Sequence, residues 1–176
     1  KILDDQNILT IPGDMFFPKE KSLNLKCKKI IKEVLNDYNM EAFFGRLVPL
    51  DNKVLSKVMK NSAPSIEQIF IKGKSAKLIG DNLNLKLFVA GKIISNKVSL
   101  LSKKNKLLQI FNICSISNST INYKGMLLSD LVRKYFIDLN QESFKSNFAL
   151  IHQRFSTNTF PSWDLAQPFK MICHNG

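Results

Sequence analysis

The sequence has 176 residues with a net charge of +12, and 44% of its residues are hydrophobic. That length and apolar content suffice for one globular domain with a core. No apolar run approaches the ~18 residues of a membrane-spanning helix, and nothing near Lys1 reads as a signal peptide. The cysteines Cys27, Cys114 and Cys173 form no CxxC pair or Cys/His cluster, so we expect neither a disulfide framework nor a metal site.

The basic excess, with 26 Lys and Arg against 14 Asp and Glu, raises the question of a nucleic-acid partner. The arginines are Arg46, Arg133 and Arg154, and the densest lysine cluster, 97–106, has Phe111 as its one aromatic neighbour. Aromatic platforms interleaved with basic residues are missing. We therefore favour a solvated basic surface with no nucleic-acid or membrane partner. A basic nucleic-acid-binding module remains the alternative from another class.

The first part of the chain alternates strand and helix patterns. An apolar run at 15–17, bounded by Gly13 and Pro18, predicts a short buried strand. Apolar residues at three- and four-residue spacing predict two long amphipathic helices, at 19–38 and 80–103. Further segments are predicted as strands at 40–50 and 66–71 and as a short helix at 52–60.

The second part of the chain carries the clearest turn signal. Residues 107–117 have apolar side chains on both faces, which predicts a central strand. The Ser117-Asn118-Ser119 turn predicts a hairpin with a second strand at 120–124. Ser129 is predicted to cap a helix that runs to about Phe136. Two more strands are predicted, at 148–155 and 169–173. This mixed order predicts an α+β fold rather than a parallel βαβ series.

The polar residues near the C-terminal end form the best candidate for a small-molecule site. The planar fork of Arg154 suits a carboxylate held at two points, although a surface ion pair is the alternative. Asn175 and Gly176 offer a side-chain donor and an accessible backbone N–H that could hold an oxyanion, although Asn-Gly also forms turns. His152 and His174 flank these residues, which suggests a general base. No Ser or Cys is arranged as its nucleophile, so a histidine packed in a strand is at least as well supported.

Three motifs in this part of the chain make a family resemblance visible. They are His152–Trp163 (HQRFSTNTFPSW), Leu165–Phe169 (LAQPF) and His174–Gly176 (HNG). This run resembles the amidotransferase domain of the large glutamate synthase chain. The match extends upstream to 13–18, 46–49, 114–118 and 123–127, and it is weakest over 73–106.

The resemblance implies a four-layer αββα fold of the N-terminal-nucleophile hydrolase type and a glutaminase activity. In that family a cysteine at the mature N-terminus attacks the side-chain amide of L-glutamine and releases ammonia, which converts 2-oxoglutarate to glutamate. By resemblance, Arg154 binds the substrate α-carboxylate and Thr157 lies near the substrate. Asn175 and Gly176 correspond to the oxyanion hole.

The resemblance also implies what this chain should lack. None of its cysteines matches the family's nucleophile, so we expect 1–176 to be a domain truncated at both ends and inactive alone. It implies FMN and an iron–sulfur cluster in the parent protein, none in this fragment, and ferredoxin or NAD(P)H as electron donor. The expected location is the bacterial cytoplasm or the plastid stroma. A catalytically degenerate amidotransferase-like domain is a further alternative.

Overall fold

The computed structural model describes residues 11–74, 81–155, 158 and 160–169. The chain divides into two compact units. Unit 1 comprises Lys1–Leu47 and Pro64–Ile121, and unit 2 comprises Val48–Ala63 and Asn122–Gly176.

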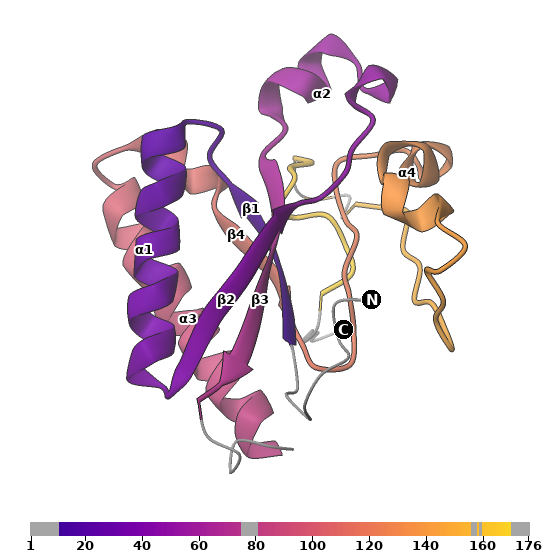
Figure 1. Cartoon of the computed structure of the whole chain (residues 1–176). Coiled ribbons are helices and arrows are strands. Elements are labelled where there is room, and N and C mark those ends of the chain that lie inside the picture. The colour runs from indigo at the N-terminus through magenta and orange to yellow at the C-terminus, as the bar shows by residue number, and fades with distance from the viewer. Residues whose placement is uncertain (1–10, 75–80, 156–157, 159, 170–176) are drawn as a thin grey trace. The chain divides into compact units, whose positions relative to one another are not determined.

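Unit 1 is built on an antiparallel sheet (Figure 1). Its described strands are β1 (Ile11–Phe17), β2 (Met40–Leu47), β3 (Ser65–Gly73) and β4 (Asn112–Ile116), in the order β2-β3-β1-β4. The central strand β1 pairs with β3 on one side and with β4 on the other. All three pairings are antiparallel, so the predicted α+β class is confirmed for unit 1.

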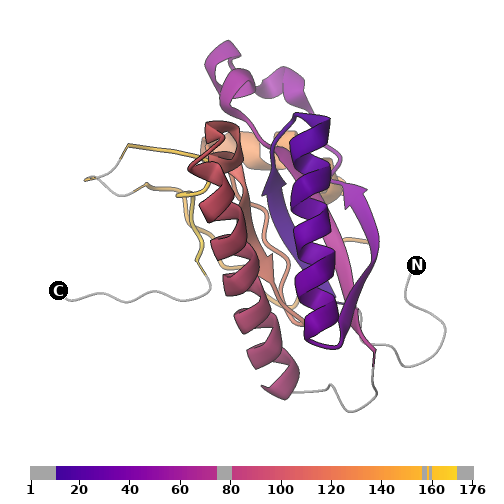
Figure 2. The ribbon, with the colours of Figure 1, turned by 90° about the vertical axis from the view of Figure 1, so that its left-hand side faces the viewer.

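Two helices, α1 (Lys21–Asp37) and α3 (Asp81–Ser102), lie side by side on one face of this sheet (Figure 2). Their buried residues recur every three or four positions, as an amphipathic helix requires. They pack against alternate residues of the strands, because successive side chains of a strand point to opposite faces. The shared core includes Met15, Phe17, Leu23, Cys27, Ile31, Leu35, Ile69, Ile71, Leu87, Ile94 and Val98.

The end of α1 is set by Asn39, whose φ of 58° is left-handed. Asparagine tolerates this conformation better than most side chains. The Asn39 N–H still bonds the Asn36 carbonyl at 3.0 Å, and the chain then turns into β2 at Met40.

Both long helices were predicted correctly to within three residues at each end, and so was the short segment that became β3. β1 begins at Ile11, earlier than predicted, because its whole length pairs with β3. β2 ends at Leu47 rather than at residue 50.

The prediction of a central strand at 107–117 is wrong in two respects. Lys106–Ile110 forms a 3₁₀ helix, η2, and only Asn112–Ile116 is a strand. The side chain of Asn105 accepts the Leu107 N–H at 3.0 Å, which caps η2 and removes these residues from the strand. In the described sheet β4 is an edge strand, not a central one.

The predicted hairpin at Ser117–Ser119 is also wrong, since residues 120–124 form no strand. β4 pairs instead with the distant strand β1. The Ser117 hydroxyl accepts the N–H groups of Ser119 and Thr120 at 3.2 Å, so a turn exists without a returning strand.

Unit 2 consists of short helical pieces and loops. Its described elements are η1 (Asn52–Val54), α2 (Lys57–Ser62), α4 (Ser129–Tyr135) and η3 (Ile137–Asn140). The single helix predicted at 52–60 is thus two pieces, because Leu55 is extended and Ser56 caps α2 by accepting the Met59 N–H. Ser129 does not cap α4, since Leu128 holds the N-cap position and no side chain bonds there.

The strand predicted at 148–155 is wrong, because these residues are irregular and mostly exposed. Phe148 and Ile151 are 75% and 83% exposed. A strand needs a neighbour for its backbone groups, and the described part of unit 2 offers no strand beside them. Of the strand predicted at 169–173, residues 170–173 lie outside the described residues.

Candidate functional site

Trp163, the last residue of the HQRFSTNTFPSW motif, fixes the loop 160–169 of unit 2. It is 4% exposed, and its ring lies 6.1 Å from that of Tyr135. Its indole Nε1–H donates to the Ser62 hydroxyl at 3.2 Å. A buried indole needs such a partner, so this bond together with the ring packing holds the loop against the end of α2.

Lys124 fastens the same loop from the other side. Although it is a lysine, it is only 4% exposed. Its Nζ donates to the Asp164 carbonyl at 2.8 Å and lies 4.7 Å from the centre of the Phe169 ring. A buried ammonium is tolerated only with partners of this kind. Lys124 therefore holds the loop 160–169 in place through Asp164 and Phe169.

The neighbours of Lys124 extend this contact. The side-chain amide of Asn122 donates to the Pro168 carbonyl at 3.2 Å, and the Tyr123 hydroxyl donates to Asp138 Oδ2 at 2.8 Å. A Cβ on Gly125 would meet the Trp163 ring. The segments 123–127 and 161–169, both singled out in the sequence, therefore lie against each other within unit 2.

Arg154 leads into this anchored loop and is exposed. Its side chain makes no hydrogen bond or ion pair with the part of the chain that the structure describes. His152 Nε2 bonds the Arg154 main-chain carbonyl, so this histidine engages the backbone and leaves the guanidinium available. An exposed guanidinium of this kind keeps both of its forked donor pairs for a ligand.

The other predicted site residues lie outside the described residues. These are Thr157, Asn175 and Gly176, together with His174 and Cys173. Whether they converge on Arg154 therefore stays a prediction.

The described cysteines are poor candidates for a nucleophile. Cys27 is fully buried in the core of unit 1, and burial raises the pKa of its thiol from 9.0 to about 11. A thiol in this state stays protonated and inert. Cys114 is half-buried in β4.

Burial also raises the pKa of the Tyr135 hydroxyl, to about 12.

Within the described residues no group of three His, Cys, Asp or Glu side chains could hold a metal ion. In that same part of the chain, no helix combines the length and the apolar character that a membrane crossing needs.

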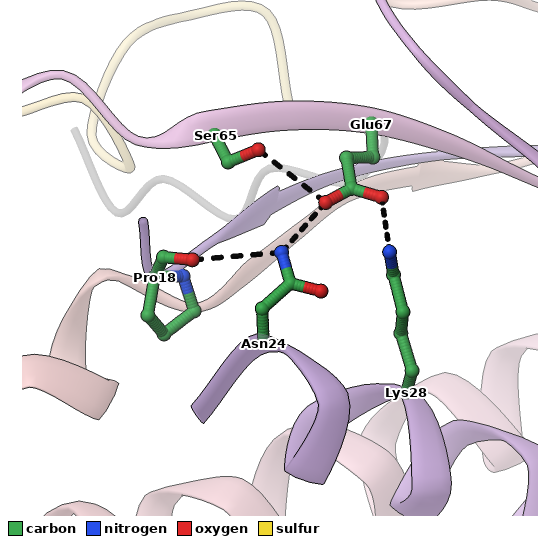
Figure 3. Close-up of polar contacts among 5 residues, drawn as sticks. All are labelled: Pro18, Asn24, Lys28, Ser65 and Glu67. Atoms are coloured by element: carbon green, nitrogen blue, oxygen red, sulfur yellow. Dashed lines mark hydrogen bonds and ion pairs between the residues drawn. The ribbon is translucent and has the colours of Figure 1, made fainter. Parts of the chain in front are cut away.

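Unit 1 holds two buried polar clusters that sequence reasoning missed. In the first, Glu67 of β3 accepts from Lys28 Nζ at 2.6 Å and Asn24 Nδ2 at 2.6 Å, both on α1 (Figure 3). Ser65 adds a longer hydrogen bond of 3.3 Å. Both carboxylate oxygens are satisfied, so this cluster ties α1 to β3.

The second cluster lies on the sheet face away from the helices. Gln68 donates to Asp14 Oδ1 at 2.8 Å and accepts from Arg46 Nε at 2.7 Å. Asp14 and Gln68 are 3% and 2% exposed. A polar residue within an apolar strand was the only available signal, because the partners are far apart in the chain.

Comparisons with known proteins agree with the predicted resemblance. The profile of the family "Glutamine amidotransferases class-II" matches residues 3–176. The chain is 39% identical over 176 residues, its full length, to the ferredoxin-dependent glutamate synthase of Antithamnion sp., of which this covers 11%. It is 35% identical over 164 residues to the chloroplastic ferredoxin-dependent glutamate synthase of Oryza sativa subsp. japonica, covering 93% of this chain and 10% of that protein. It is 36% identical over 172 residues to the glutamate synthase [NADH] of Saccharomyces cerevisiae, covering 93% of this chain and 8% of that protein.

The chain therefore belongs to the class-II glutamine amidotransferases. Its predicted resemblance to the amidotransferase domain of glutamate synthases is confirmed by these relatives. The chain spans about a tenth of the length of the curated relatives it matches.

Proposed function

We propose that this chain is part of the glutaminase domain of a glutamate synthase, which hydrolyses L-glutamine to glutamate and ammonia. The observation that carries this proposal is the packing of 123–127 against 161–169 around Trp163, with the exposed Arg154 leading into the same loop. Both segments are among those in which the chain resembles the amidotransferase domain of glutamate synthases.

In this proposal Arg154 binds the α-carboxylate of glutamine. Two parallel N–H···O bonds from one planar guanidinium fix both the position and the orientation of a carboxylate. Its exposure and its lack of a partner among the described residues support this role. Thr157 lies beside the substrate, while Asn175 and Gly176 donate to the oxyanion that forms when the amide is attacked.

The nucleophile in this proposal is none of the cysteines of this chain. The attacking thiol adds to the amide carbon, its proton passes to the amide nitrogen, the C–N bond breaks, and ammonia leaves while a thioester remains for water to hydrolyse. The burial of Cys27 and the raised pKa of its thiol support excluding it. We accordingly propose that 1–176 alone is inactive.

The finer fold is proposed to be the four-layer αββα sandwich. The described part of unit 1 supports it by supplying one helix layer, α1 and α3, on one antiparallel sheet. A second sheet and second helix layer would complete the four layers.

The whole protein would use the released ammonia to convert 2-oxoglutarate reductively to glutamate. The names of the relatives favour ferredoxin as electron donor, although one is a glutamate synthase [NADH]. By the same resemblance, FMN and an iron–sulfur cluster would belong to the parent protein and not to this fragment. Relatives named chloroplastic support a plastid stroma, with the bacterial cytoplasm as the alternative.

Substitution of Arg154 in the full-length parent tests this function. Arg154→Lys keeps the charge but loses the fork, so the KM for glutamine should rise about 10- to 100-fold, the worth of one or two charge-assisted hydrogen bonds. Glutamate formation from added ammonia should stay unchanged, since that route bypasses the glutamine site.

Arg133→Lys is the matched control, because Arg133 is exposed on α4, outside the anchored loop. An unchanged KM in Arg154→Lys would remove Arg154 from the glutamine site. Ammonia release by the purified 1–176 chain would overturn the assignment of the nucleophile.

A further inference from the structure

Unit 1 has a surface groove that is lined by none of the predicted site residues. It lies between α1 and β2 and has a volume of about 640 Å³. Its floor is apolar and includes Ile31, Ala42, Phe43 and Ile69. All of these residues belong to unit 1, so the groove is a property of that unit.

The groove exists because β2 carries small residues where it faces α1. Ala42 and Gly45 line it, and a Cβ on Gly45 would lie 3.1 Å from Cδ1 of Ile69. Larger side chains at these two positions would cover Ile69 and fill the space. Ile31 and Ile69 at the base of the groove are 1% and 5% exposed, so its exposed apolar surface comes from Leu25, Phe43 and Phe44.

β2 is also an edge strand of the described sheet (Figure 1). An edge strand presents N–H and C=O groups that can pair with another strand. The register with β3 shifts between Ala42 and Phe44, so the regular part of this edge is 44–47. Phe44 and Leu47 on this stretch are 41% and 67% exposed.

The rim of the groove is basic. Lys28, Lys29 and Lys32 of α1 line it together with one acidic residue, Glu33. Lys28 is committed to Glu67 at 2.6 Å, while Lys29 lies 3.9 Å from Glu33. Lys32 is exposed and has no ion pair with the described residues. An acidic occupant would therefore gain attraction along α1.

We propose that β2 and this groove bind an extended acidic segment of a partner protein, which adds to the sheet as an outer strand. Its backbone pairs with 44–47. Its carboxylates on the helix side reach Lys29 and Lys32, and its alternate side chains pack on Phe44 on the opposite face. Main-chain pairing supplies affinity, and the lysines select acidic segments over basic ones.

Two labelled synthetic peptides, one of alternating valine and glutamate and one of alternating valine and lysine, test this binding on the 1–176 chain. Fluorescence anisotropy should show saturable binding of the acidic peptide and a Kd at least about tenfold weaker for the basic one. Hydrogen exchange of the backbone amides of 44–47 should slow when the acidic peptide is bound.

Two variants separate groove binding from general charge attraction. Gly45→Leu fills the groove, and Lys32→Glu reverses its free cation. Each should raise the Kd for the acidic peptide about tenfold or more. Lys97→Glu, an equal charge change at an exposed position of α3, is the control and should leave the Kd within about twofold. Phe44→Ser replaces Gly45→Leu if circular dichroism shows that the latter does not fold.

Equal binding of both peptides, equal weakening by Lys97→Glu, or slowed exchange outside β2 would overturn the proposal. Binding of a fatty-acid anion such as decanoate in the groove, without binding of the acidic peptide, would also overturn it in favour of a small amphipathic ligand.

Discussion

Gly125 and Trp163 are packed so closely that a Cβ on Gly125 would lie 2.7 Å from Cζ3 of the indole. The second-nearest ring atom would be 3.1 Å away. The ring cannot move aside freely, because Trp163 is buried against Tyr135 and bonded to Ser62. Glycine is therefore required at this position by space.

Gly125→Ala should destabilise unit 2 by about 1–3 kcal/mol, the usual cost of overpacking a rigid site. Trp163 is the single tryptophan of the chain, so its emission reports directly on this contact. The measurement is denaturant unfolding followed by tryptophan fluorescence, with a red shift of the native emission expected in the variant.

Gly91→Ala is the matched control, since the nearest atom to its added Cβ is Ile116 Cδ1 at 3.5 Å. Gly91 lies within α3, where alanine should stabilise by up to about 1 kcal/mol. Equal stability of Gly125→Ala and the unmodified chain would contradict the close packing described here.

The Lys28–Glu67 pair makes a second prediction. Lys28→Met leaves the buried Glu67 carboxylate without its cation, although Asn24 and Ser65 still donate to it. Because Lys28 is a third exposed, we expect a loss of about 1–3 kcal/mol of unfolding free energy, below the full cost of breaking a buried pair.

The double variant Lys28→Met with Glu67→Gln should recover part of that loss, since it removes the unpaired charge. Lys29→Met is the control, because its 3.9 Å pair with Glu33 is solvent-exposed. Its effect should stay within about 0.5 kcal/mol. Strict additivity of the Lys28 and Glu67 changes would show that the pair is not coupled.

Because of the Cys27 thiol, we expect the free energy of unfolding to fall at alkaline pH. The unfolded thiol ionises near pKa 9.0, whereas burial raises the folded pKa to about 11. Between these values the native state binds more protons than the unfolded state. The contribution of the protonated Cys27 thiol to the free energy of unfolding is therefore fully present below pH 9 and is lost as the pH rises to 11. The two-unit difference corresponds to at most about 3 kcal/mol.

Cys27→Ala removes this component, although its cavity lowers stability at every pH. The test compares the two chains by urea unfolding at pH 9 and pH 11. The difference in unfolding free energy between the unmodified chain and Cys27→Ala should be smaller at pH 11 than at pH 9. A gap that stays constant would mean that the Cys27 thiol does not ionise in this way.

The helices were predictable because their signal is local. The apolar spacing of Leu23, Cys27 and Ile31 already specifies the buried face of α1, and the same holds for Leu87 and Ile94 of α3. A helix satisfies most of its own backbone groups, so much of the signal for a long helix lies in its local sequence.

The strands were less predictable because their partners are remote. The turn at Ser117–Ser119 suggested a local hairpin, yet Ile116 pairs with Gly13. Pairing across such a distance leaves no trace in the neighbouring residues. The strand prediction for 148–155 failed for a related reason, since an apolar run forms a strand only beside another strand.

Within the candidate site, local motifs identified the segments but not their contacts. Lys124 gave no signal of burial, because lysine is ordinarily a surface residue. Its bond to the Asp164 carbonyl joins residues of two separate motifs. The glycine at 125 became interpretable only once Trp163 was seen against it.

The strand order β2-β3-β1-β4 has a consequence for how the chain is made. β1 leaves the ribosome early, but its partners β3 and β4 follow only after α1 and then after α3. During synthesis one edge of β1 stays unpaired until β3 emerges, and the other edge stays unpaired until Ile116 emerges. Sheets closed by such remote partners fold slowly, so we expect nascent unit 1 to depend on chaperones that shield exposed strands until its last strand is made.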